Sequence, residues 1–206
     1  MGEGKRFAPI DYINAARVPD TMAEGDFFPW QIIRRKSPDI GLLGFETQTM
    51  LCRWGWGSMH MQHGEIVMDD SLPELRRHLP IWMKARGRVL KTGLGLGCVV
   101  RGLLINPEVR HIDVVEIDER IIERCGAEFL GNPRVTIHHA NAHTWDIDGR
   151  SWDFIWHDIH DNDESEHLAA QHGRLLVKYL TAAPIERQGA WAFPREAKRR
   201  IRRMLG

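Results

Sequence analysis

The feature that most constrains the fold is the segment of residues 87–118, which consists of a strand-like run, a glycine loop, a helix-like stretch and a second strand-like run. Its loop contains three glycines that alternate with other residues, namely Gly93, Gly95 and Gly97. The second apolar run covers residues 112–115 and ends at Glu116. This order of elements is typical of one half of a nucleotide-binding α/β unit.

Both the loop and the acid point to a bound ligand. Glycine has no Cβ, so the backbone of the loop can pass close under a ligand. Glu116 follows the loop by about twenty residues, where a carboxylate can hold the hydroxyl groups of a ribose. A dinucleotide fingerprint requires Gly or Ala at its sixth position, and Cys98 stands there. The G-x-G-x-G spacing therefore predicts a ligand without a pyrophosphate.

Polar residues also follow the next two strand-like segments of the chain. These segments cover residues 134–138 and 152–156. The first leads into the pair Asn141-Ala142, and the second leads directly into His157 and Asp158. Because ligands bind beyond the carboxyl ends of parallel strands, we expect these residues to lie at one ligand-binding edge of a sheet.

The stretch from about residue 64 to residue 163 resembles the class I S-adenosylmethionine-dependent methyltransferases, in the branch similar to spermidine synthases. This resemblance implies an α/β fold with a Rossmann-like sheet and S-adenosylmethionine as the cofactor. It implies that the glycine loop lies under the methionine and ribose, and that Glu116, with Ile117 next to it, binds the ribose. It also implies that the pair Asn141-Ala142 contacts the adenine and that Asp158 faces the reacting centre.

The segment of residues 157–164 contains the candidate catalytic side chains. Transfer to a protonated nucleophile requires a base within reach of its proton. The predicted catalytic residues are Asp158, His157, whose unperturbed pKa suits a base, and Asp161. Two alternatives stay open, an acidic loop that caps the following helix and a metal site. Methyl transfer from a sulfonium needs no metal, so we predict no metal ligand.

Several positions depart from the patterns of the two enzyme classes. Lys91 stands two residues before Gly93, where methyltransferases often have an acid, and Leu96 stands where spermidine synthases usually have Asp. Asp158 and Asp161 match their Asp-x-x-Asp motif without its proline, and their upstream tyrosine signature is missing. We therefore predict a methyltransferase of unknown acceptor first. A spermidine-synthase-like aminopropyltransferase comes second, and a non-catalytic S-adenosylmethionine-binding module third.

The remaining chain predicts two parts and a shortened sheet. Residues 1–70 are expected to form an extension with a β-hairpin made of residues 59–61 and 65–68. Residues 71–206 are expected to form the cofactor-binding domain. Its predicted helices cover residues 71–85, 164–179 and 194–205. Only residues 175–180 offer a further strand after Asp161, so the sheet is expected to be short at its C-terminal end, completed by the hairpin or by a second subunit.

Composition disfavours several classes of partner, although nucleic acid stays possible. Lys plus Arg and Asp plus Glu are 28 each, so no global field favours nucleic acid, and the basic tail at residues 195–203 is expected to be a solvated helix face. No segment is apolar enough to span a membrane and no signal peptide is evident. Three cysteines without metal spacing favour a cytoplasmic setting. The expected partners are a methyl acceptor and, because the sheet is short, a second copy of the chain.

Overall fold

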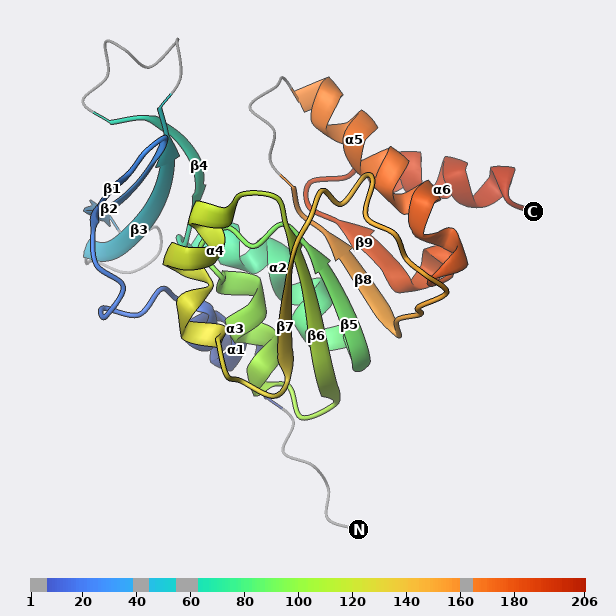
Figure 1. The fold of residues 1–206 in the computed structure, drawn as a ribbon, viewed down its shortest axis with the longest axis horizontal. Helices are drawn as coiled ribbons and strands as arrows, with labels where there is room; N and C mark the ends of the chain where they lie inside the picture. The colour runs from blue at the N-terminus through green and yellow to red at the C-terminus, as the bar shows by residue number, and fades with distance from the viewer. Residues whose placement is uncertain (1–6, 39–44, 55–62, 160–164) are drawn as a thin grey trace.

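The computed structural model describes residues 7–38, 45–54, 63–159 and 165–206. Within them the chain forms an antiparallel sheet that lies beside a parallel sheet, and helices cover both faces of the parallel sheet (Figure 1). The parallel sheet has five strands in the order β7-β6-β5-β8-β9. The protein therefore has the predicted α/β, Rossmann-like fold.

Four strands of this sheet confirm the strand-like runs of the sequence. They are β5 (Gly87–Thr92), β6 (Val109–Glu116), β7 (Val135–His139) and β8 (Phe154–His157). Two of them, β5 and β6, are buried along nearly their whole length, because helices cover both faces of the sheet. The helices that follow them are α3 (Cys98–Ile105) and α4 (Glu119–Cys125), with a 3₁₀ turn at Ala127–Phe129.

Two helices begin at side-chain caps, and the first of them begins where the sequence predicts it. The helix α2 (Leu72–Lys84) begins after Ser71, whose hydroxyl oxygen accepts a hydrogen bond from the Glu74 N–H at 3.4 Å. The helix α4 begins after Asp118, whose carboxylate accepts from the Arg120 N–H at 3.0 Å. Side-chain oxygens at these positions satisfy backbone donors that the first helical turn leaves unpaired.

The N-terminal part is larger than the predicted hairpin. It contains α1 (Pro9–Ala16) and four antiparallel strands, β1 (Gly25–Phe27), β2 (Trp30–Pro38), β3 (Phe45–Arg53) and β4 (Glu65–Asp69). The strand β4 pairs with β3, and residues 59–61 of the expected hairpin lie outside the described residues. This sheet is separate from the parallel sheet, so it does not complete it as expected. Ile32 and Leu51 nevertheless share one apolar core with Leu94 and Leu96.

The predicted strand at residues 175–180 is wrong. This segment belongs to α5 (Ser165–Lys178) and the 3₁₀ turn Tyr179–Thr181. Leu175 and Tyr179, four residues apart, are fully buried in one cluster with Leu90 and Ile155, so the apolar run serves a helix face. After a 3₁₀ turn at Ile185–Arg187, the three-residue strand β9 (Gln188–Ala190) ends the described sheet, and α6 (Arg195–Met204) follows.

A buried carboxylate ties three strands together outside the cavity. Asp113, on β6, is 1 % exposed and accepts hydrogen bonds from Arg88 Nε at 2.7 Å, Trp152 Nε1 at 2.8 Å and His138 Nε2 at 2.9 Å. Burial would raise the pKa of this carboxyl, but the three donors outweigh it and lower the pKa to about 2. The network therefore stabilises the fold only while Asp113 is ionised.

Replacing Asp113 with asparagine is expected to lower the free energy of unfolding by about 2 kcal/mol at pH 7. Because the folded-state pKa lies below the unfolded value, this stability is present above about pH 4 and is lost as the pH falls towards 2. Chemical denaturation should therefore show a difference between wild type and variant that shrinks below pH 4. The exposed Asp26→Asn is the control, and a difference that stays constant with pH would contradict the assignment.

Candidate functional site

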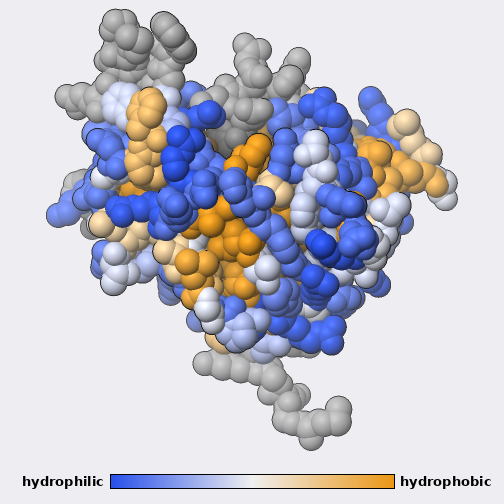
Figure 2. All heavy atoms as spheres, in the orientation of Figure 1, coloured by the Kyte–Doolittle hydropathy of each residue, from blue (hydrophilic) through white to orange (hydrophobic). Residues whose placement is uncertain are grey.

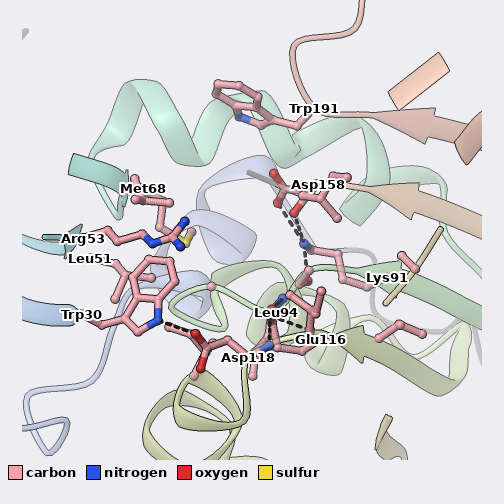
Figure 3. A pocket seen from close by; sticks show the side chains of 18 of the residues that line it. Trp30, Leu51, Arg53, Met68, Lys91, Leu94, Glu116, Asp118, Asp158 and Trp191 are labelled. Carbon is pink, nitrogen blue, oxygen red and sulfur yellow. Dashed lines mark hydrogen bonds and ion pairs between the residues drawn. The ribbon is translucent and has the colours of Figure 1, made fainter. Parts of the chain in front are cut away.

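A cavity of about 550 Å³ opens between the carboxyl edge of the parallel sheet and the N-terminal sheet (Figure 3). Its walls come from the ends of β5, β6 and β8, from the loop after β7, and from β2, β3 and β4. The volume is in the range of cavities that bind cofactors. The cavity therefore lies where the sequence predicts the ligand, and the N-terminal sheet supplies a wall that the sequence did not predict.

Glu116 ends β6 at the cavity and organises the backbone around it. Its Oε2 accepts from the Leu94 N–H at 2.6 Å, and its Oε1 accepts from the N–H groups of Ile117 at 2.8 Å and Asp118 at 2.9 Å. A carboxylate has about four acceptor positions, so it retains capacity for a ligand hydroxyl. Glu116 thus joins the glycine loop to the strand end and faces the cavity (Figure 3).

The glycine loop is in contact with two neighbouring elements. Gly93 has φ +79°, and a Cβ there would lie 2.2 Å from the Asp158 carbonyl oxygen. A Cβ at Gly95 would lie 2.1 Å from Met68 Sδ, and that sulfur accepts from the Leu96 N–H at 3.0 Å. Gly93 and Gly95 line the cavity, whereas Gly97 is the N-cap of α3 outside the lining. The loop therefore packs against Asp158 and Met68, and Gly93 and Gly95 also face the cavity.

Replacing Gly93 with alanine is expected to lower the free energy of unfolding by more than about 3 kcal/mol, since it combines a left-handed backbone with a clash against another backbone. Gly131→Ala is a matched control, because Gly131 has φ +81° and has no atom within 4 Å of a built Cβ. The control should cost about 1 kcal/mol. If chemical denaturation shows equal losses of unfolding free energy for the two variants, the contact with Asp158 does not contribute to the cost.

Three further residues of the predicted cofactor site lie at the cavity. Asn141, Ala142 and Ile117 all line it. The Asn141 side-chain oxygen accepts from the His143 N–H at 2.9 Å, which fixes the turn after β7. Ile117 is 61 % exposed, and apolar side chains reach the surface around α4 and β7 near the centre of this face (Figure 2). An exposed apolar side chain in a cavity favours a flat, apolar ligand surface.

Asp158 forms a buried ion pair with Lys91 at the opposite end of the cavity. Asp158 Oδ2 lies 2.9 Å from Lys91 Nζ, which also donates to the Gly93 carbonyl oxygen at 2.6 Å. Burial alone would raise the pKa of the Asp158 carboxyl, but the Lys91 ammonium and the imidazole of His78 outweigh it, and the pKa lies below its ordinary value. Asp158 is therefore a carboxylate at neutral pH.

His157, the second predicted catalytic residue, does not lie at the cavity. His157 is fully buried outside the cavity lining, with Nδ1 3.2 Å from Thr92 Oγ1 and Nε2 3.3 Å from Gln188 Oε1. Burial lowers its pKa to about 3, so it stays neutral. Asp161 lies outside the described residues. Of the predicted catalytic group, Asp158 is the member that the structure brings to the cavity.

The sequence did not predict several residues that line the cavity. Trp30, on β2, donates from Nε1 to Asp118 Oδ2 at 2.8 Å, and the Arg53 guanidinium lies over its ring. Trp191, after β9, donates from Nε1 to Glu74 Oε1 at 2.6 Å, and both residues line the cavity. No local pattern in the sequence marks Glu74 or the two tryptophans as cavity residues.

The charged side chains of the cavity are mainly acidic. The carboxylates in its lining are Asp69, Glu74, Glu116, Asp118 and Asp158, and the cations are Arg53 and Lys91. Such a lining favours a cationic ligand. Among the described residues no group of His, Cys, Asp and Glu is arranged to hold a metal ion.

Comparison with known proteins gives a partial match. No protein-family model matches the sequence. The chain is 32 % identical over 98 residues to the polyamine aminopropyltransferase of Streptococcus pneumoniae, a match that covers 42 % of this chain and 34 % of that protein. It is 36 % identical over 75 residues to the same enzyme of Agathobacter rectalis, covering 34 % and 26 %. The match thus spans about a third or less of these relatives.

Two solved methyltransferase structures align with part of the chain. The 23S rRNA methyltransferase ErmE aligns with a TM-score of 0.41 and 18 % identity, covering 56 % of this chain and 42 % of that one. A human methyltransferase 10 domain containing protein aligns with a TM-score of 0.44 and 12 % identity, covering 59 % and 60 %. None of the helices in the described part of the chain has the length and apolar character to cross a bilayer.

Proposed function

We propose that the chain is an S-adenosylmethionine-dependent methyltransferase. The observation that carries the proposal is the order of side chains along one sheet edge. Asn141 and Ala142 follow β7, Glu116 ends β6, the glycine loop follows β5 and Asp158 follows β8, and all of them line one cavity apart from Gly97. Base, ribose and reactive tail of a nucleoside would follow the same order. The acidic lining suits a ligand with a sulfonium cation.

Each of the cavity residues would have a distinct role in the transfer. Glu116 accepts a hydrogen bond from a ribose hydroxyl, and Ile117 covers one side of the adenine. The bound cofactor supplies a methyl group on a cationic sulfur. Asp158, held as a carboxylate, accepts the proton that the acceptor releases. Met68, which packs against the glycine loop, and Trp191 line the cavity and exclude water, and the shaped cavity aligns the reacting atoms within attack distance.

An aminopropyltransferase is the second candidate. The specific observation in its favour is the sequence match to the polyamine aminopropyltransferases, together with the acids Glu74 and Asp69 in the lining, which suit an amine acceptor. Leu96 counts against it, because its side chain is fully buried in the apolar core and offers no carboxylate to an amine. A non-catalytic binding module is the third hypothesis, and it predicts nucleotide binding without turnover.

Calorimetric titration with S-adenosylmethionine, S-adenosylhomocysteine and decarboxylated S-adenosylmethionine tests these functions. Micromolar binding of the first two, with weaker binding of the third, is the expected result. Preference for the decarboxylated nucleotide would favour aminopropyl transfer. Absence of binding to all three would refute the proposal. The acceptor, a cytoplasmic setting and a homodimer stay predictions, and the three buried free cysteines agree with the cytoplasmic one.

A further inference from the structure

We infer that Lys91 determines which sulfonium nucleotide the cavity accepts, because its pairing with Asp158 favours the nucleotide that retains its α-carboxylate over the decarboxylated form. The inference rests on the proposed nucleotide site. It concerns a residue at which this chain departs from the expected acid.

The order of the strands gives the direction in which the nucleotide lies. Ribose bound at Glu116 is at the end of β6, and the base lies towards Asn141 beyond β7. The sheet order is β7-β6-β5-β8, so the 5′ substituent points the other way, towards the ends of β5 and β8. Lys91 and Asp158 stand there, and both line the cavity (Figure 3). The amino-acid tail of the nucleotide therefore ends against this ion pair.

Burial and hydrogen bonds hold the Lys91 side chain in a fixed position. Lys91 is 1 % exposed, and its Nζ donates to the carbonyl oxygens of Thr92 at 3.1 Å and Gly93 at 2.6 Å while it lies 2.9 Å from Asp158 Oδ2. These partners hold the ammonium directly under the first glycine of the loop. The pair as a whole is neutral, although the remainder of the lining is acidic.

The charges of Lys91 and Asp158 distinguish the two nucleotide tails. A tail with both ammonium and carboxylate groups is itself neutral, and it can place its ammonium towards Asp158 and its carboxylate towards Lys91. The decarboxylated tail has only the ammonium, so it is attracted by Asp158 and opposed by Lys91, and it has no carboxylate of its own to place against Lys91. Because the Lys91 side chain is buried, these interactions are stronger than on the surface. Without Lys91, the same cavity would present an unpaired carboxylate and would favour the decarboxylated nucleotide.

The experiment compares affinities for S-adenosylmethionine and decarboxylated S-adenosylmethionine in the wild type and in Lys91→Met, Asp158→Asn and the double variant. The wild type should prefer the first nucleotide. The affinity ratio should shift at least about 10-fold towards the decarboxylated nucleotide in Lys91→Met and in the opposite direction in Asp158→Asn. The double variant, which again has a neutral pair, should return to within about threefold of the wild-type ratio.

Circular dichroism of each variant checks the fold, since single replacements leave one buried charge unpaired. Should Lys91→Met fail to fold, Asp158→Asn and the double variant still test the inference, because the ratio must shift towards S-adenosylmethionine in the first and return in the second. A ratio that is the same in all folded variants would overturn the inference and leave the nucleotide site intact. Absence of binding to the wild type would overturn the proposed function, and the inference with it.

Discussion

Replacing Asp158 with asparagine is expected to lower the rate of group transfer at least about 100-fold, which is the usual weight of a positioned general base. Asparagine keeps the volume of the side chain but cannot accept the proton of the acceptor. The affinity for S-adenosylmethionine should change little, because the ligand ammonium loses a partner while the ligand carboxylate gains access to an unpaired Lys91. Turnover and affinity should therefore separate.

Single-turnover kinetics with an acceptor found by screening, and titration of the same preparations, would measure the two quantities. The exposed Asp26→Asn is the control for a change of carboxylate to amide. The low pKa of Asp158 also predicts that wild-type turnover persists to pH values below those at which an ordinary aspartate is protonated, about 3.9. A variant that retains turnover within about threefold would assign the proton to another group.

The parallel half of the fold could be predicted because its signals are local. Strands such as β5 and β6 are short apolar runs that end at glycines or an acid, and the carboxyl ends of parallel strands share one edge. The starts of α2 and α4 follow from Ser71 and Asp118, whose side chains bond to the next turn. These features depend on neighbours within a few residues, so one sequence is enough to find them.

The errors arise where contacts are distant in sequence. The apolar residues of a run such as residues 175–180 fit a strand as well as a buried helix. This run is helical because it packs against Leu90. Burial of His157 depends on Gln188, which comes 31 residues later. Met68 and Trp30 reach the cavity because an antiparallel sheet folds over the glycine loop. No spacing rule within the sequence describes that arrangement.

Replacing Glu116 with alanine is expected to weaken nucleotide affinity about 10- to 100-fold, since a hydrogen bond to a charged acceptor contributes about 1.5–3 kcal/mol. The structure adds a second effect. Both carboxylate oxygens also hold backbone N–H groups, those of Leu94, Ile117 and Asp118, so alanine leaves donors of the glycine loop without partners. The melting temperature should therefore fall as well.

Glu116→Gln separates the two effects, because glutamine keeps one acceptor oxygen for the loop but removes the charge that strengthens bonds to the ribose. It should lose most of the affinity with a smaller loss of melting temperature than Glu116→Ala. The exposed Glu119→Ala, three residues further along the chain, is the matched control and should leave both quantities unchanged. If Glu116→Ala binds S-adenosylmethionine as tightly as the wild type does, the carboxylate serves the loop alone and the ribose lies elsewhere in the cavity.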